Sequence, residues 1–296
     1  MLNRRTTPDY YPIPHHLRLS YEKNMARGLR EASSSKLIIA SLVRDVEPNI
    51  PQIIQKVESL GKYFKDYIVL IVENDSKDRT RPMLLRWRKQ NPRVHVLGCG
   101  VNATNACKLP KTPKTIGHQV DLPRLEKMAT LRNIYLDYMK KHLDPKEWPY
   151  TLVWDLDSLS VVYEDGFLHS IGAMVKNPDV GVMCANGIYN WGAFTYFYDA
   201  LAYLEKGEDF HIDDHMAHNI RHGVLESIGE RGGDPHEVDS CFSGFTIYRS
   251  SELVKPKVTY TLPKGQMLCE HVALHQRMNT KKAVDPSMIN LVLLNE

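Results

Sequence analysis

The sequence lacks several features that would place the chain in a familiar class. No apolar run approaches the roughly 18 residues of a membrane-spanning helix, and the start, MLNRRTTPDYYPIPHH, has no apolar segment after its arginines. We therefore expect no signal peptide, no membrane span and a cytoplasmic location. The formal charge of +3 is small and the lysines and arginines are scattered, so we expect no nucleic-acid partner.

Cysteine is also scarce, and its spacing is uninformative. The five cysteines are an odd number and form no C-x-x-C motif, so we expect neither a zinc site nor a disulfide framework. A G-x-x-x-x-G-K-[ST] loop is absent as well. The stretch LGCGVNA imitates a dinucleotide-binding fingerprint, but Pro110 and Pro113 follow before a helix could complete, and this interpretation is set aside.

Apolar runs alternate with helical patterns over the first half of the chain. KLIIASLVRD, YIVLIVENDS, RVHVLGCG and YTLVWDLDS read as strands, and helical spacing lies between them, most clearly in RLEKMATLRNIYLDYMKKHL. Nearly all-apolar strands that alternate with helices predict an α/β fold with a mostly parallel sheet, covered by helices on both faces. Residues 1–35 look like an N-terminal arm, and residues 36–296 like a single domain.

Polar residues follow several of these strands directly. Arg44, the E-N-D-S run that begins at Glu73, and the Asp155/Asp157 pair all sit at strand carboxyl ends, where ligands bind in such sheets. Two aspartates separated by one residue would lie about 6 to 7 Å apart on one strand face and would repel each other. A pair that stays ionised there usually has a cation beside it.

The long helix carries a cation on its apolar side. Leu125, Met128, Leu136 and Met139 share one face, and Arg132 falls within that face. A cation on a core-facing stripe needs an anionic partner, which is either a buried acid or a ligand. The helix leads directly into the Asp155 strand, which favours a ligand.

These residues together resemble a known family. The turn E-N-D-S-x-D-x-T, a helix bearing R-N and a strand ending in D-x-D are similar to nucleotide-sugar-dependent glycosyltransferases of the GT-A fold, over about residues 36 to 275. A closer resemblance is to the cryptococcal mannosyltransferase and capsule-associated group. Its arginine-bearing helix, Y-D and S-C-W-G-G motifs are similar to L-R-N at 131–133, Y-D at 198–199 and S-C-F-S-G at 240–244.

The resemblance implies a transfer of sugar from a UDP- or GDP-linked donor to a hydroxyl of a glycan or other acceptor. It also implies a GT-A sheet with a small antiparallel extension, a nucleotide-sugar half over residues 36–160 and an acceptor half over residues 161–296. Mn²⁺ or Mg²⁺ would be held by Asp155, Asp157 and His271. The donor would contact Ser41, Arg44, Glu73, Asn74, Asp78, Arg124, Arg132 and Asp155.

The second half would form the acceptor side. The implied substrate contacts are Trp191, Tyr198, Asp199, Gly244 and Phe245. The candidate catalytic carboxylates are Glu270, which would accept the proton of the acceptor hydroxyl, and Asp239. Glu270-His271 stands where related enzymes carry an acidic pair, so the stereochemical outcome stays open. The run HIDDHMAHNIRH spaces His211, His215, His218 and His222 like a helical stripe, which would be a metal site or a solvated surface.

Two other functions remain open at this point. A haloacid-dehalogenase-like phosphohydrolase also uses D-x-D after an apolar strand, but there the pair follows the first strand, and here three strands precede it. A catalytically inactive sugar-binding module would keep the aromatic residues without the carboxylates. The intact Asp155, Asp157 and Glu270 argue against such a module.

Overall fold

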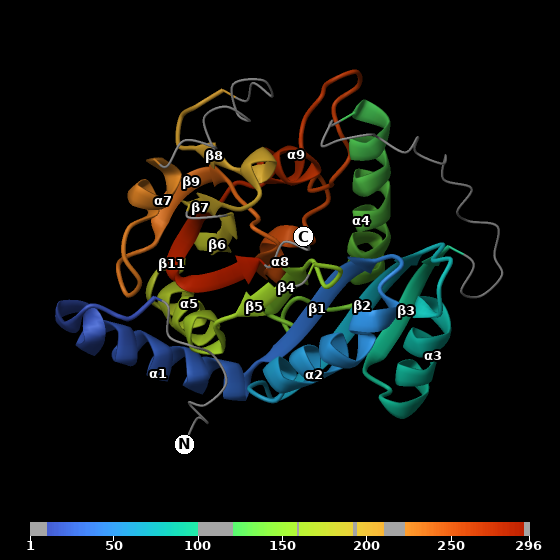
Figure 1. The fold of residues 1–296 in the computed structure, drawn as a ribbon, viewed down its shortest axis with the longest axis horizontal. Helices are drawn as coiled ribbons and strands as arrows, with labels where there is room; N and C mark the ends of the chain where they lie inside the picture. The colour runs from blue at the N-terminus through green and yellow to red at the C-terminus, as the bar shows by residue number, and fades with distance from the viewer. Residues whose placement is uncertain (1–10, 100–120, 159, 192–193, 210–222, 293–296) are drawn as a thin grey trace.

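A computed structural model describes residues 11–99, 121–158, 160–191, 194–209 and 223–292. Its helices are α1 (Arg18–Ser34), α2 (Ile50–Gly61), α3 (Thr80–Gln90), α4 (Leu122–His142), α5 (Glu164–Lys176), α7 (Gly223–Ile228), α8 (Ser250–Leu253) and α9 (Glu270–His275), with short 3₁₀ turns η1 (His15–Leu17), η2 (Glu47–Asn49) and η3 (Ala200–Ala202). Its strands are β1 (Lys36–Val43), β2 (Asp66–Asn74), β3 (Val94–Cys99), β4 (Tyr150–Trp154), β5 (Ser160–Val162), β6 (Val180–Trp191), β7 (Phe194–Phe197), β8 (Leu204–Glu205), β9 (His236–Ser240), β10 (Phe245–Arg249) and β11 (Lys281–Val292). Figure 1 shows their arrangement.

These strands form one sheet in the order β3-β2-β1-β4-β10-β6-β11-β9-β8, with β5 paired to β11 and β7 to β6. The first four strands run parallel, as the apolar runs predicted. β10 lies antiparallel between β4 and β6, so Phe245 pairs with Trp154. The chain therefore returns from its second half to place the start of β10 beside the end of β4, at the carboxyl edge of the parallel strands.

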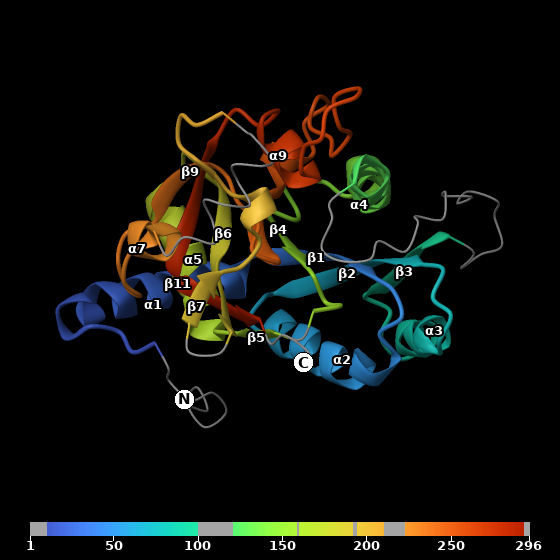
Figure 2. The same ribbon diagram turned by 45° about the horizontal axis from the view of Figure 1, so that its top comes forward.

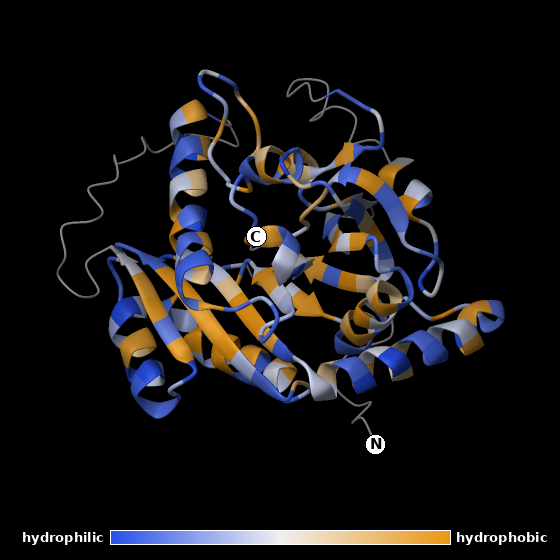
Figure 3. Cartoon of the chain, turned by 180° about the vertical axis from the view of Figure 1, so that it is seen from behind, coloured by the Kyte–Doolittle hydropathy of each residue, from blue (hydrophilic) through white to orange (hydrophobic). Residues whose placement is uncertain are grey.

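Alternate residues of β1 face two different cores. Ile38 and Leu42 pack in the core that includes α4, whereas Leu37 and Ile39 pack in the core that includes α2 and α3. Figure 2 shows α4 on one side of the sheet and α2 and α3 on the other, and in Figure 3 the strands are mostly apolar, as burial on both faces requires. The predicted α/β fold with helices on both faces is confirmed.

One expectation about cysteine was wrong. Cys184 of β6 and Cys241, directly after β9, form a disulfide with an S–S distance of 2.06 Å across 57 positions of sequence. Counting cysteines cannot reveal such a pair, because the two residues meet only when β10 is inserted between β4 and β6.

Among the described residues, no helix combines the length and apolar character that crossing a membrane requires.

The first helix packs closely against α5. A Cβ added to Gly28 would lie 1.7 Å from the carbonyl oxygen of Leu168, and one added to Gly172 would lie 1.9 Å from that of Asn24. The two helices therefore cross at these glycines with their backbones in contact. Helix α1, which belongs to the segment expected to form an N-terminal arm, is thus packed against the domain.

This crossing gives a stability prediction. Gly28→Ala should lower the free energy of unfolding by about 1–3 kcal/mol, because the added methyl overpacks the contact, although alanine normally stabilises a helix by about 1 kcal/mol relative to glycine. Urea unfolding measures the change, and Arg30→Ala at an exposed position of the same helix is the control. A Gly28→Ala protein as stable as the wild type would contradict the close crossing.

Candidate active site

The two aspartates of W-D-L-D lie in the turn that follows β4. Asp155 donates its backbone N–H to the Gly244 carbonyl at 2.8 Å, and Leu156 donates to Oγ of Ser41 at 3.4 Å. Leu156 is buried and anchors the turn from inside, while Asp157 is exposed. The turn therefore holds both carboxylates at the carboxyl edge of the sheet, and Ser41 supports the turn.

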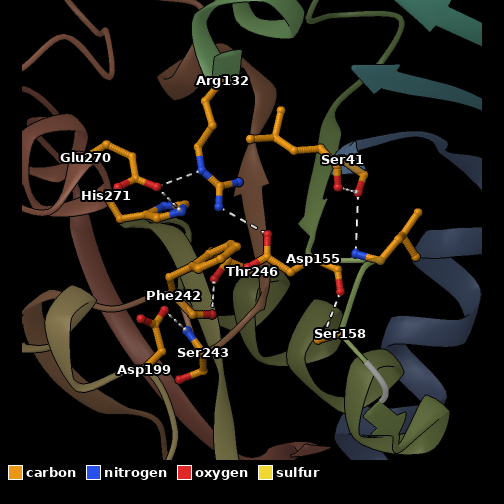
Figure 4. Close-up of polar contacts among 12 residues, drawn as sticks. Ser41, Arg132, Asp155, Ser158, Asp199, Phe242, Ser243, Thr246, Glu270 and His271 are labelled. Atoms are coloured by element: carbon orange, nitrogen blue, oxygen red, sulfur yellow. Dashed lines mark hydrogen bonds and ion pairs between the residues drawn. The ribbon is translucent and has the colours of Figure 1, made fainter. Parts of the chain in front are cut away.

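Arg132 of α4 connects two of the acids. Its Nε donates to Oε1 of Glu270 at 2.9 Å and its Nη2 donates to Oδ1 of Asp155 at 3.1 Å, as Figure 4 shows. The guanidinium also lies over the Phe242 ring, 4.8 Å from its centroid. The side chain of Arg132 is only 3% exposed, so the anionic partner that the sequence required is present twice.

The turn between β9 and β10 forms a second wall of the site. Ser243 and Gly244 have left-handed backbones, with φ of 55° and 71°, and so does Asp199, with φ of 70°. The Ser243 N–H donates to Oδ2 of Asp199 at 3.2 Å. Left-handed backbone is uncommon for serine and aspartate, and it persists only where the surrounding structure holds it.

Tyr198 and Asp155 both lie next to Gly244. A Cβ added to Gly244 would be 3.4 Å from the Tyr198 ring and 3.9 Å from the Asp155 Cβ. Glycine therefore keeps this approach open. The structure thus brings together residues that are distant in sequence and that were expected in one site, namely Arg132, Asp155, Asp157, Tyr198, Asp199, Gly244, Glu270 and His271.

Negative charge exceeds positive charge in this cluster. Burial together with Asp155 raises the pKa of Asp157 to about 7, and burial together with Asp155 and Glu270 raises the pKa of Asp199 to about 7. The Asp157 side chain is exposed to solvent. Nearby groups nevertheless displace part of the water around its carboxylate, and this loss of hydration raises its pKa. Arg132 compensates only part of the charge, so the cluster is one that an added cation would stabilise.

The carboxylates of the D-x-D turn match the ligand preferences of Mn²⁺ and Mg²⁺. Asp155 and Asp157 supply the hard oxygen ligands that these ions prefer, and such ions commonly use one or two carboxylates plus substrate phosphates. Within the described residues, no group of three or more His, Cys, Asp or Glu side chains is arranged to hold a metal. The residues therefore fit an ion shared with a phosphate ligand, and a preformed three-ligand site with His271 is not observed.

The two histidines of α9 are packed instead of exposed. His271 stacks on Phe242 with ring centroids 3.6 Å apart. Burial, and to a smaller extent the positive charge of Arg132, lower the pKa of His271 well below the usual range. Both His271 ring nitrogens are buried without a hydrogen-bond partner. His275 bonds Ser240 through Nδ1 and Tyr248 through Nε2, so both of its ring nitrogens are engaged in the core and neither is available to a metal.

The polar turn after β2 is largely occupied by its own contacts. Oε1 of Glu73 accepts from the Ser76 N–H at 2.6 Å, and Oε2 accepts from Nε of Arg81 at 2.5 Å. Asp78 accepts from the Thr80 N–H at the start of α3 and from the Glu47 N–H. Glu73 and Asp78 therefore shape the turn, and Asn74, the last residue of β2, lies beside them.

Two basic residues expected at the donor lie at exposed positions. Arg44 follows β1 and contacts Asp45 at 3.3 Å. Arg124 is in the first turn of α4, where its backbone N–H bonds the N-cap Asp121. The structure shows neither side chain in contact with the Arg132 cluster.

Two expectations on the acceptor side need correction. Phe245 is fully buried, with its ring against Trp154 and Phe167, so it is a core residue and cannot contact a substrate directly. Asp239 accepts from the Gly207 N–H and lines an open groove with Arg249. Arg249 pairs with the first residue of β4, so Asp239 lies toward the opposite edge of the sheet from the cluster.

Other residues singled out in the sequence cannot be placed. Trp191 ends β6, but its side chain lies outside the described residues, and the histidine stripe of residues 211–222 lies outside them entirely. The residues that sequence reasoning missed are Ser243, which binds Asp199, and Phe242, which packs against Arg132. Their signal was the C-F-S-G sequence itself, since glycine commonly marks a left-handed turn.

Comparison with known proteins places the chain in a family. The model of the family described as cryptococcal mannosyltransferase 1 matches residues 36–277. Curated proteins give no match to the chain.

Two solved structures are similar to this chain. S. aureus TarS 1–349, in complex with UDP-GlcNAc, has a TM-score of 0.51 and 11% identity, and the match covers 88% of this chain and 59% of TarS. The chain thus spans about three fifths of that structure. Pyrobaculum calidifontis PcManGT, in complex with GDP-Man and Mn²⁺, gives a TM-score of 0.48 and 11% identity over 93% of this chain and 66% of its own. The fold is that of the GT-A glycosyltransferases.

The raised pKa of Asp199 gives a pH prediction. An unfolded aspartate has a pKa near 3.9, so the folded carboxyl, at about 7, binds more protons between these values. Stability then falls as pH rises from about 4 to about 7. In EDTA, Asp199→Asn should raise stability at pH 8 by about 1 kcal/mol or more, with little change at pH 4.

Unfolding in urea at both pH values measures this difference, with Asp137→Asn on the exposed face of α4 as the control. The asparagine oxygen can still accept the Ser243 N–H, so hydrogen bonding is retained. A stability change that is equal at pH 4 and pH 8 would show that Asp199 does not share the charge of the cluster.

Proposed function

Because the chain belongs to the cryptococcal mannosyltransferase 1 family and is a glycosyltransferase, we propose that it is metal-dependent and uses a nucleoside-diphosphate sugar, UDP- or GDP-linked. The acceptor is a hydroxyl group of a glycan or another glycoconjugate. The observation that carries this proposal is the excess of carboxylates around one buried arginine at the carboxyl edge of a GT-A sheet. TarS, which shares the fold, binds UDP-GlcNAc.

Asp155 and Asp157 would hold Mn²⁺ or Mg²⁺. A bound divalent ion supplies electrostatic stabilisation of the charge that develops on the leaving diphosphate. The raised pKa of Asp157 supports this assignment, because a cation would favour the charged form of the carboxylate.

Arg132 would be the protein cation next to the diphosphate. Its planar guanidinium can serve carboxylates and phosphate oxygens with several N–H groups at once. Glu270 holds Nε of Arg132 in a buried ion pair, so we assign Glu270 a positioning role that fixes the guanidinium. Its proposed role as a proton acceptor becomes secondary, since one of its oxygens is already engaged.

The donor nucleoside would lie over the turn after β2. Asn74 would reach the base or ribose, and Glu73 and Asp78 would keep the turn in shape through their backbone contacts. Arg44 and Arg124 are exposed near this edge, and we retain them as candidate contacts for the outer part of the nucleotide.

The acceptor would approach from the side of Tyr198 and Asp199. Tyr198 lies beside Gly244, so an aromatic face and a carboxylate border the same space, a combination suited to a sugar. Trp191 remains a candidate contact. We keep residues 36–160 as the nucleotide-sugar half and residues 161–296 as the acceptor half, although β10 and α9 of the second half complete the donor side.

Of the two alternative functions, one is disfavoured and the other is decided by experiment. A haloacid-dehalogenase-like hydrolase is disfavoured by the family match, which spans residues 36–277. An inactive sugar-binding module is distinguished from an enzyme by measuring both binding and turnover.

Thermal-shift measurements with UDP, GDP and their sugars, with and without Mn²⁺, should show a metal-dependent rise in melting temperature for one nucleotide, because a ligand that binds the native state stabilises it. Binding without turnover would identify the inactive module.

The metal assignment is tested at Asp157. Asp157→Ala should reduce transfer by at least about 100-fold, as expected for loss of charge stabilisation at the leaving group, while the melting temperature stays equal or rises because repulsion with Asp155 is relieved. Asp137→Ala on α4 is the control. A variant that keeps most of its turnover, or a wild-type rate that survives EDTA, would refute metal dependence.

The arginine assignment is tested with Arg132→Lys, which keeps the charge but loses the planar fork. Nucleoside-diphosphate affinity should fall at least about tenfold, or about 1.4 kcal/mol, while affinity for the uncharged nucleoside changes little. Isothermal titration measures both, with Arg86→Lys on the exposed face of α3 as the control. Equal losses for nucleotide and nucleoside would mean that Arg132 only supports the structure.

A further inference from the structure

The Cys184–Cys241 disulfide lies in the core, at the start of the chain segment that leads from β9 to the site. Cys241 is the first residue after β9, and only residues 241–244 connect β9 to β10. Cys184 pairs with Thr246 of β10 across the sheet. Both cysteines are fully buried. The disulfide therefore ties the beginning of the four-residue connection to the strand that flanks its end.

Each of the following residues supports a different part of the site. Phe242 packs under the guanidinium of Arg132, and the Ser243 N–H binds the Asp199 carboxylate. The Gly244 carbonyl accepts the N–H that begins the D-x-D turn, at 2.8 Å. A displacement of this connection would thus move the arginine, the acceptor-side acid and the metal-binding turn together.

The connection is the part of this region that sheet pairing does not fix. β10 is hydrogen-bonded to both β4 and β6, and its register begins at Phe245. Before that residue, Ser243 and Gly244 have two successive left-handed conformations, which the local sequence does not favour at serine. The Ser243 carbonyl accepts from Nδ2 of Asn290 at 2.8 Å, and the disulfide adds a covalent restraint immediately upstream.

We propose that Cys184 and Cys241 are positioning residues for glycosyl transfer, whose disulfide holds the 242–244 turn in the conformation that the site requires. This inference rests on the proposed function of the Arg132 cluster. Neither cysteine touches a substrate, since both are buried, so the effect is transmitted through Phe242, Ser243 and Gly244.

The same disulfide bears on where the chain folds. Disulfides form and persist in oxidising compartments and are rare in the cytosol, where thiols are kept reduced. An active form that depends on this disulfide would therefore have to fold where thiols can be oxidised, whereas the sequence led us to expect a cytoplasmic location.

The test compares oxidised wild type, reduced wild type and the double variant Cys184→Ala/Cys241→Ala. Peptide mapping without reduction should recover the linked pair. Transfer should fall at least tenfold on reduction, measured well below the melting temperature, and should return with the linked fraction on reoxidation. The double variant should be slow from the outset and should not respond to dithiothreitol, which assigns the effect to this pair.

A destabilised control separates positioning from stability. Leu60→Ala truncates a buried residue of α2 and should lower the melting temperature while retaining the transfer rate at low temperature. Hydrogen exchange gives a second measure that does not depend on activity. Without the disulfide, peptides covering 241–247 and 153–157 should exchange faster, while those covering the α1–α5 contact should not.

The outcomes are distinct. An oxidised wild type that neither binds nucleotides nor transfers sugar would refute the proposed function, and the exchange measurement would still decide the disulfide inference. Three results would each overturn the positioning role. They are full transfer by fully reduced wild type, unchanged hydrogen exchange at residues 241–247 without the disulfide, and free thiols at both cysteines in protein produced under oxidising conditions.

Discussion

The structure of the site depends on one buried cation. Arg132 of α4 is bound on one side by Asp155, which directly follows β4, and on the other by Glu270 of α9. A buried charge that loses a partner costs about 3–5 kcal/mol, so the ion pairs fix the three elements relative to one another. The remaining carboxylates, Asp157 and Asp199, lie outside these ion pairs, and their excess charge is what makes the cluster suited to a metal-bound diphosphate.

This arrangement requires backbone conformations that are unfavourable in isolation. Asp199 and Ser243 have positive φ and hydrogen-bond to each other. A rigid sheet on one side and the disulfide at Cys241 on the other can hold such residues in place. The unfavourable backbone conformations of the site therefore depend on the stability of the core, because the same strands form the core and position the acids at its edge.

Local sequence patterns predicted much of this. Four apolar runs became β1 to β4, since strands buried on both faces must be apolar along their length. The apolar face of α4 indicated that Arg132 needs an anionic partner, but it favoured a ligand, whereas the structure pairs Arg132 with two acids of the chain. Long-range features were less accessible. Asp239 was expected at the site because it is near Gly244 in sequence. In the structure, Asp239 near the end of β9 lies toward the opposite edge of the sheet from Gly244, which directly precedes β10. The Cys184–Cys241 pair depends on strand order, which cysteine counting cannot supply.

The most direct test is an anomalous difference map from crystals grown with Mn²⁺ and the nucleoside diphosphate that stabilises the protein. The account predicts one manganese peak about 2.0–2.2 Å from a carboxylate oxygen of Asp157, with the diphosphate between that ion and Arg132. A peak at the histidines of residues 211–222, or a nucleotide bound away from Arg132, would contradict it.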